Sequence, residues 1–361
     1  MSSTKARRPL TVRSNESTKK QLAFARAEGD SIDRCLQWIR SQTGGLSGQL
    51  RAGEYLITYA LSGPEGWYLY NNKAVEWSDA GSANAHLWLF VQDGADGRIV
   101  PPLHIKLTVR SETGTLAQQL PLDYAWMPLV NGYGNNLQLP GPNRYHFQVN
   151  IDPPAYHRHD PYNGDRFTDA VTGIFDLVVT GLDLSVLSSS MEMQQDLSRH
   201  SGMAYENTLQ AMYEQANDGR DTLSGDYRVA YALEYSEGYW YMRKGRMTYN
   251  TENELSGEHN AHLEVAVLDR VTGRFMFDLM VTATLFKESG DPVGTQAEMF
   301  MWHPWLYHYG ENWRVPKAGI YSLKVHIDPP AYRRYGKIAG KQFTSPIDMS
   351  FDHLQIKTGQ K

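Results

Sequence analysis

A six-residue motif, Ile-Asp-Pro-Pro-Ala-Tyr, occurs twice in this chain, at 151–156 and again 176 positions later at 327–332. Sliding the sequence on itself by 176 positions aligns 84–156 with 260–332 without a gap, and 26 of the 73 aligned positions are identical. The chain therefore holds two copies of one unit, here called the first repeat and the second repeat. Function should therefore be read both from the positions at which the copies agree and from those at which they differ.

Each repeat begins with a helical pattern. Apolar residues recur at i, i+3, i+4 and i+7 over 20–42 in the first repeat, and the same spacing returns over 209–216 ahead of the second body. This spacing places apolar side chains on one stripe of an amphipathic helix. We therefore expect a helix in front of each body.

The rest of each repeat reads as β-structure. Short apolar segments, partly alternating, are separated by turn residues such as Asp96-Gly97 and Thr272-Gly273. Six or seven such segments per repeat predict an antiparallel β-sandwich. The two prolines of the repeated motif should end a strand, because proline has no N–H to donate to a ladder.

These patterns predict a mainly β protein with two tandem antiparallel β-sandwich domains, each preceded by a helix. The expected division is a disordered polar N-terminus over 1–20, a helix and the first sandwich over 21–187, a linker and helix over 188–222, and the second sandwich over 223–361.

Composition and charge exclude several classes of protein. The net charge of -5 gives no basic surface for nucleic acid. The single cysteine, Cys35, permits no internal disulfide. No apolar run is long enough for a transmembrane helix. The N-terminus lacks the apolar core of a secretory signal, so the cytoplasm is the default expectation.

Candidate metal ligands gather in the second repeat. His262 and Glu264 are two positions apart on an expected strand and so share one face. Met301 and the methionine two positions before it repeat this spacing, and His308 follows in an aromatic loop. Histidine, methionine and carboxylate together suit copper, and imidazole with carboxylate also suits iron or zinc. The alternative is a set of solvated histidines beside a core methionine stripe.

The first repeat has its own histidine pair, His157 and His159, in the loop after the prolines. The second repeat has Arg333 and Tyr335 at the matching positions. Two alternating histidines in a loop indicate metal binding, and an ordinary surface loop is the alternative.

At these residues the chain resembles the periplasmic iron-uptake metal-binding proteins, the family that includes the treponemal 34-kilodalton lipoprotein antigen. The resemblance rests on His262-Leu-Glu264, on Met299-Phe-Met301 followed by His308-Tyr-Gly-Glu-Asn, and on the late His157-Arg-His159 loop. It covers the β body of each repeat and not the helices.

The resemblance implies an immunoglobulin-like or cupredoxin-like sandwich that works as a homodimer, binds copper with iron as cargo, and acts in the periplasm beside an iron permease. Carried over position by position, it implies a ligand set that comprises His262, Glu264, Met301, His308 and, for the late histidine, His159 or His157.

Neither repeat holds the whole set. The first repeat has Trp88, Ala125 and Gly132 where the second has its Glu, Met and His ligands, and the second has Tyr335 in place of the late histidine. We therefore expect a pseudo-dimer within one chain, with one composite site made mainly by the second repeat and completed by the histidine loop of the first.

Two other functions remain open from the sequence. The Trp-rich loop 302–313 offers planar rings on which a non-catalytic carbohydrate- or protein-binding module could stack its ligand. An enzyme is not expected, because the chain lacks the nucleophile-elbow, dinucleotide, P-loop and zinc-protease motifs.

Overall fold

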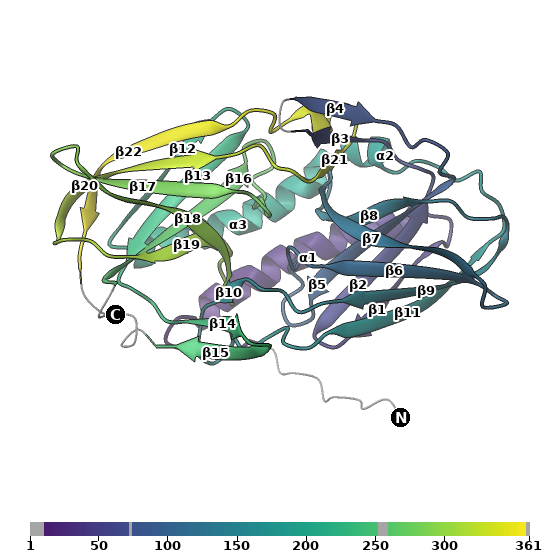
Figure 1. Ribbon diagram of the computed structural model, residues 1–361, viewed down its shortest axis with the longest axis horizontal. Coiled ribbons are helices and arrows are strands. Elements are labelled where there is room, and N and C mark those ends of the chain that lie inside the picture. Colours follow the sequence, from purple (N-terminus) through teal and green to yellow (C-terminus); the bar gives the residue numbers. More distant parts are fainter. Residues whose placement is uncertain (1–10, 72–73, 252–258, 359–361) are drawn as a thin grey trace.

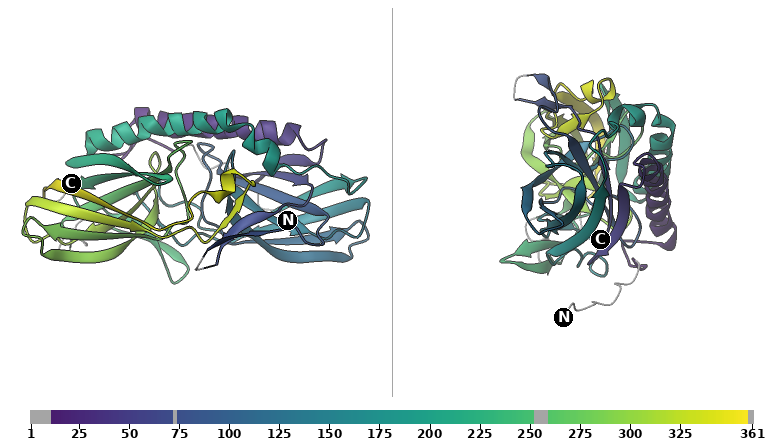
Figure 2. Two further views of the ribbon diagram at one scale, coloured as in Figure 1. Left: turned by 90° about the horizontal axis from the view of Figure 1, so that it is seen from above. Right: turned by 90° about the vertical axis from the view of Figure 1, so that its right-hand side faces the viewer.

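The structure is a computed structural model that describes residues 11–71, 74–251 and 259–358. Two β bodies lie end to end, one for each repeat, and two long helices run side by side across both of them (Figures 1 and 2). The predicted fold class, two antiparallel β-sandwiches each preceded by a helix, is confirmed.

The two long helices are α1 (Lys19–Ser41) and α3 (Gln195–Gln215), and two short ones are α2 (Ser188–Glu192) and η1 (Ala339–Lys341). Helix α1 begins at a capping box, in which Thr18 and Gln21 bond each other's backbone N–H groups. The predicted apolar stripe of α1 is buried, with Cys35 and Ile39 fully enclosed.

The strands of the first repeat and its connections are β1 (Ser47–Ala52), β2 (Tyr55–Ser62), β3 (Trp67–Tyr70), β4 (Val75–Ser78), β5 (Ala85–Asp93), β6 (Ile105–Ser111), β7 (Leu116–Trp126), β8 (Gly132–Leu137), β9 (Asn143–Ile151), β10 (His157–Arg158) and β11 (Val171–Val179). Those of the second are β12 (Asp218–Ser224), β13 (Tyr227–Glu234), β14 (Tyr239–Arg243), β15 (Arg246–Asn250), β16 (Ala261–Asp269), β17 (Val281–Lys287), β18 (Pro292–Trp302), β19 (His308–Trp313), β20 (Gly319–Ile327), β21 (Arg333–Tyr335) and β22 (Ile347–Ile356).

One long strand in each body joins the two layers of the sandwich. The first part of β7 pairs with β6, and its last residues pair with β8. Strand β18 does the same between β17 and β19. Strands β9 and β20 end at Ile151 and Ile327, directly before the Asp-Pro-Pro sequences, as the missing proline N–H predicts.

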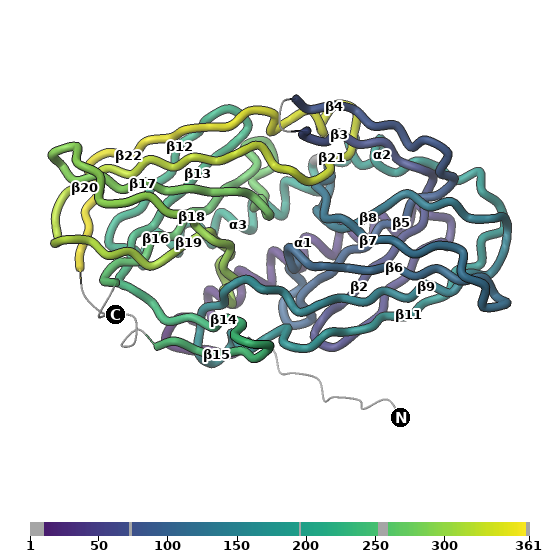
Figure 3. The backbone as a smooth tube through the Cα atoms, in the orientation of Figure 1, coloured from purple at the N-terminus to yellow at the C-terminus, as the bar shows by residue number. Residues whose placement is uncertain are grey.

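The two repeats exchange a strand. Strand β10 of the first repeat pairs with β14 and β18 of the second, and β21 of the second repeat pairs with β3 and β7 of the first. The backbone trace shows each segment leaving its own body to reach the other (Figure 3). Loops of one repeat are therefore built into the sheet of the other.

The residues that both repeats share hold the scaffold together. The hydroxyl of Tyr133 donates to Val100 O and accepts from Leu103 N–H, and Tyr309 makes the same two bonds in the second repeat. These bonds tie a buried loop to strand β8 or β19, which explains why the tyrosine is present in both copies.

Two details of the expected domain division are wrong. Residues 1–10 of the expected disordered terminus lie outside the described residues, but 11–20 are folded, and Thr11 and Ser17 are buried. The second body begins at Asp218 rather than at 223, because β12 pairs along its whole length with β13. The polar sequence of 11–20 did not predict that this segment packs against another loop.

Candidate metal centre

Strand β16 carries the first two candidate ligands. His262 is fully buried and Glu264 is 5% exposed, and both point to the same face of the strand, as their spacing predicts. The neighbouring strand β19 lies antiparallel to β16, with Asn312 opposite His262 and Gly310 opposite Glu264. A Cβ atom at Gly310 would lie 3.1 Å from His262 Nε2 and 2.9 Å from the ring of His308, so glycine leaves room for both imidazoles.

Met301 and His308 face each other across the next strand pair. They are directly opposite in the register of β18 and β19, and both are fully buried. The imidazole of His308 lies 5.7 Å from that of His262, centroid to centroid, and His308 Nε2 is 3.8 Å from Glu264 Oε1. The four side chains of the second repeat thus converge on one buried point.

His159 reaches the same point from the first repeat, because it directly follows the exchanged strand β10. Its Nε2 lies 2.9 Å from the sulfur of Met301, and its ring is 5.3 Å from that of His308 and 5.1 Å from that of His262. The strand exchange therefore brings a histidine of one repeat among the candidate ligands of the other.

Hydrogen bonds orient two of the three imidazoles. His262 Nδ1 lies 3.0 Å from Asn312 Oδ1, which also accepts from the Glu237 N–H, and His159 Nδ1 lies 3.1 Å from the carbonyl oxygen of Gly238. Both partners are acceptors, so each Nδ1 carries the proton and each Nε2 presents its lone pair to the centre. Metal-binding histidines are commonly oriented in this way.

His308 differs from the other two because neither ring nitrogen has a hydrogen-bond partner among the described residues. Burial and the neighbouring histidines His159, His262 and His303 hold the pKa of His308 well below its usual range. This imidazole is therefore neutral at pH 7, with an unbonded nitrogen in a buried site. A metal ion would satisfy that nitrogen.

The distances fit a single ion. One nitrogen from each of His159, His262 and His308 lies within 4.8 Å of the other two. Two atoms that are each about 2.1 Å from one metal are at most about 4.2 Å apart, so side-chain movements below about 1 Å would close the set.

His157, the other candidate for the late histidine, lies elsewhere. It stacks on Tyr239 at 4.5 Å, and its Nδ1 is 3.9 Å from Glu311. It is not in the cluster that joins His159, His262 and His308, and the loop sequence alone could not distinguish the two histidines.

Three further side chains, Glu237, Glu16 and His303, join the centre without having been predicted as ligands. Glu237 Oε2 is 3.5 Å from His159 Nδ1, and one carboxylate oxygen each from Glu237 and Glu264 lies within 4.8 Å of a His262 nitrogen. Both repeats have glutamate at this position, Glu65 in the first, so comparing the copies gives no signal that Glu237 is a candidate ligand. For Glu16 no sequence signal existed, since it precedes the first helix.

The corresponding position of the first repeat is filled by rings. His86 remains, but Trp88 packs against it at 4.2 Å and Tyr335 packs on Trp88 at 4.7 Å. A Cβ atom at Gly132 would come within 2.7 Å of Phe90, whereas the second repeat has Ala266 in place of this phenylalanine. An imidazole like that of His308 has no room in the first repeat.

The carboxylate of Glu65 has a different structural role from that of its counterpart Glu237. Its carboxylate accepts hydrogen bonds from the N–H groups of Leu187 and Ser188 and from the Ser188 hydroxyl, at 2.8, 3.1 and 2.6 Å. It therefore holds the chain at the start of α2 rather than facing a histidine.

Acid is expected to destabilise the fold through His86. Burial lowers the pKa of His86 from 6.5 to about 3. Below about pH 6.5 the unfolded chain binds this proton and the folded chain does not, so the stability from neutral His86 is complete above that pH. It is lost as the pH falls toward 3, by about 1.4 kcal/mol per pH unit. Urea unfolding at about pH 7 and about pH 5 checks this. A His86→Gln variant keeps a donor for Asn136 and should lose less stability over the interval; equal losses would contradict the assignment.

The Trp-rich loop does not form a stacking surface. Trp302, Trp305 and Trp313 are at most 5% exposed, so the sequence-based alternative of a ring platform is wrong. These rings belong to the hydrophobic core. Among the described residues, no helix is both long and apolar enough to cross a membrane.

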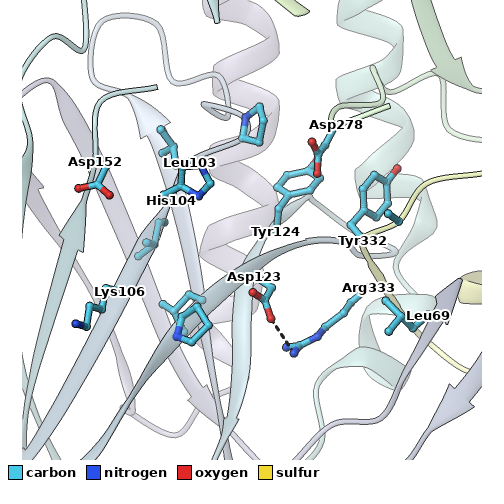
Figure 4. A pocket seen from close by; sticks show the side chains of 15 residues that line it. Leu69, Leu103, His104, Lys106, Asp123, Tyr124, Asp152, Asp278, Tyr332 and Arg333 are labelled. Carbon is cyan, nitrogen blue, oxygen red and sulfur yellow. Dashed lines mark ion pairs between the residues drawn. The ribbon is translucent and has the colours of Figure 1, made fainter. Parts of the chain in front are cut away.

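A separate cavity of about 670 Å³ lies on the first-repeat side, between β6, β7 and the segment that leads into β21. Figure 4 shows the ion pair of Asp123 and Arg333 at its wall, 2.7 Å apart, with Asp278 and His104 nearby. None of the side chains around this cavity belongs to the histidine cluster, so the cavity is not part of the candidate centre.

Comparison with known proteins gives one family and several solved structures. The family model described as "Fe2+ transport protein" matches residues 92–180 and 229–354, more than half of the chain and once in each repeat. No curated protein matches.

The solved structures found to be similar include FetP of a uropathogenic Escherichia coli strain and the P19 protein of Campylobacter jejuni. An as-isolated FetP is 20% identical with a TM-score of 0.33, over 38% of this chain and 96% of that one. A copper-bound variant of FetP, with one glutamate replaced by glutamine, is 21% identical with a TM-score of 0.33, over 39% and 95%. Copper-reconstituted P19 is 14% identical with a TM-score of 0.32, over 38% and 95%.

The match of the family model to both repeats agrees with the internal repetition of the sequence and with the two equivalent β bodies. The chain belongs to the Fe2+ transport protein family and carries the family's unit twice in tandem.

Proposed function

We propose that the protein binds one copper or iron ion between its repeats and takes part in iron uptake. The ligands would be His262, Met301 and His308 of the second repeat with His159 of the first, and Glu264 stands beside them. The observation that carries the proposal is the mutual distance of the three imidazole nitrogens, all within 4.8 Å in a buried site. Thioether and imidazole favour copper, and the carboxylates beside them suit iron.

The proposal extends to the compartment through the similar solved structures. FetP and P19 crystals contain bound copper, and FetP was produced in the periplasm. We propose a periplasmic location on this basis, and delivery of the ion to an iron permease on the resemblance to iron-uptake proteins described above. We propose binding and delivery, not catalysis.

Titration calorimetry with Cu(II) tests the composite nature of the site. His159→Ala should weaken binding by at least about tenfold, the smallest loss expected when a group that supports a metal is removed. His157→Ala is the matched control, since this histidine lies two positions away on the same loop and outside the cluster. Equal affinities of wild type and His159→Ala would restrict the site to the second repeat.

A further inference from the structure

Strands β10 and β18 come from different repeats and lie side by side in parallel, with His157 opposite Met301 (Figure 1). Each segment carries two potential metal donors at positions i and i+2. These are His157 and His159 on and directly after β10, and Met299 and Met301 on β18. Side chains two positions apart on a strand share one face. The inner pair, His159 and Met301, belongs to the candidate metal centre, and the outer pair is His157 and Met299.

The outer pair lies closer to the solvent than the inner pair. Met301 is fully buried, whereas Met299 is 51% exposed. The side chain of His159 is likewise enclosed, whereas that of His157 is 26% exposed. Because a strand rises by about 3.3 Å per residue, the outer donors stand roughly 7 Å from the inner ones along the chain. Each outer side chain is therefore one step from its inner counterpart, on the way to the surface.

The first repeat shows that side chains at the two outer positions can touch. Asp123 and Arg333 occupy there the positions of Met299 and His157. Their side chains form the ion pair drawn in Figure 4, 2.7 Å long. Strands β7 and β21 pair in the same parallel register as β18 and β10. The equivalent backbone positions therefore bring Met299 and His157 within reach of each other.

A second exposed methionine adjoins the outer pair. Met280 directly precedes β17 and is 72% exposed. Continuing the pairing of β17 with β18 by one residue places it opposite Met299, and Cβ atoms of such cross-strand pairs are about 4.5–5.5 Å apart. The first repeat has His104 and Asp123 at these two positions. The methionine pair is thus present only in the repeat that keeps the metal ligands.

The outer side chains suit a cuprous ion. Thioethers are soft ligands that select Cu(I), and imidazole also binds copper. The Nδ1 atom of His157 is buried and makes no hydrogen bond with the described residues, and the carboxylate of Glu311 is 3.9 Å from it. Methionine side chains are unbranched and flexible, so a thioether at the surface can follow a moving ion.

We propose that His157, Met299 and Met280 form an outer Cu(I) position through which copper enters and leaves the buried centre. The inference rests on the proposed function and adds the route to it. The ion would pass by exchange of ligands, from Met299 to Met301 and from His157 to His159, and would remain Cu(I) throughout. Because the outer position is exposed and the inner one is enclosed, the outer side chains set the rate of transfer and not the final affinity.

Stopped-flow mixing of metal-free protein with the coloured Cu(I)–bicinchoninate complex measures the rate of uptake. Met299→Leu, which conserves the side-chain volume, should slow uptake by at least about tenfold and leave the equilibrium Cu(I) affinity within about threefold. His157→Ala should act in the same direction. Met203→Leu is the matched control, because this methionine is 66% exposed on helix α3, and it should change neither the rate nor the affinity.

The outcomes separate this inference from the proposed function. Unchanged uptake by Met299→Leu would overturn the outer position. A matching loss of equilibrium affinity would also overturn it, because Met299 would then support the buried ligands. Wild-type protein without copper affinity would overturn the proposed function instead. In that case Ag(I), a soft and redox-inert probe, is titrated into protein labelled at its methionine methyl carbons. The nuclear magnetic resonance signals of Met280 and Met299 should shift together, and unshifted signals would overturn the outer position by themselves.

Discussion

Replacing His308 by alanine is expected to weaken Cu(II) binding by at least about a hundredfold, the upper end of the loss seen when a mere supporting residue is removed. His308 lies between Met301, directly opposite on β18, and the rings of His262 and His159. Its ring nitrogens have no hydrogen-bond partner among the described residues, so no other protein group competes for them. Calorimetric titration of Cu(II) into the purified variant measures the loss.

The matched control is His86→Ala in the first repeat. His86 occupies the position of His262, and its Nδ1 faces Asn136 Oδ1 at 2.8 Å as His262 faces Asn312. Because Trp88 and Tyr335 fill the space around it, Cu(II) affinity should not change. A comparable loss in both variants would mean that the effect of His308→Ala comes from the fold and not from a ligand.

Arg98→Ala is expected to lower the free energy of unfolding by about 3–5 kcal/mol, the usual cost of leaving a buried charge without its partner. Arg98 is fully buried and its NH2 group bonds Asp96 at 2.9 Å. The same group donates to the carbonyl oxygen of His303 in the other repeat, also at 2.9 Å, and the guanidinium lies 3.9 Å from the centre of the Tyr307 ring. One substitution thus breaks an ion pair, a bond between the repeats and a cation–π contact.

Urea unfolding followed by circular dichroism measures this change. Arg144→Ala is the control, because Arg144 and Asp176 form a half-exposed pair 3.6 Å apart, and such pairs contribute about 0–1 kcal/mol. If both variants lost the same free energy of unfolding, the bond from Arg98 to the other repeat would contribute no more than an exposed ion pair, and Arg98 would not join the repeats. The bond to His303 also predicts that Arg98→Ala disturbs the loop that carries this histidine.

The sequence showed much of the fold because the signals are local. Strand alternation, the helical stripe around Cys35 and the strand-ending prolines after Ile151 and Ile327 each depend on neighbours in the chain. Because the chain contains the unit twice, the same helix and strands could be assigned in both copies. It also separated scaffold from candidate ligands, since Tyr309 is kept in both copies while His308 has only Gly132 as its counterpart.

The choice between His157 and His159 could not be made from the sequence. Both alternate on the same short segment, and their positions depend on how β10 pairs with β18 of the other repeat. That pairing joins residues more than a hundred positions apart, and its register is set by the packing of two whole bodies. The aromatic loop misled for a related reason, since rings such as Trp302 can face solvent or core with the same sequence.

Repetition and periodicity along the chain were enough to predict two copies of one β-sandwich, of which only the second keeps the histidine, methionine and glutamate pattern. Which distant side chains meet there depends on the tertiary structure, which brings in His159 through the exchanged strand and Glu16 through the segment ahead of helix α1. The physical reason is that secondary structure follows from periodicity along the chain, whereas a buried site is built by contacts between segments whose separation in sequence carries no local pattern.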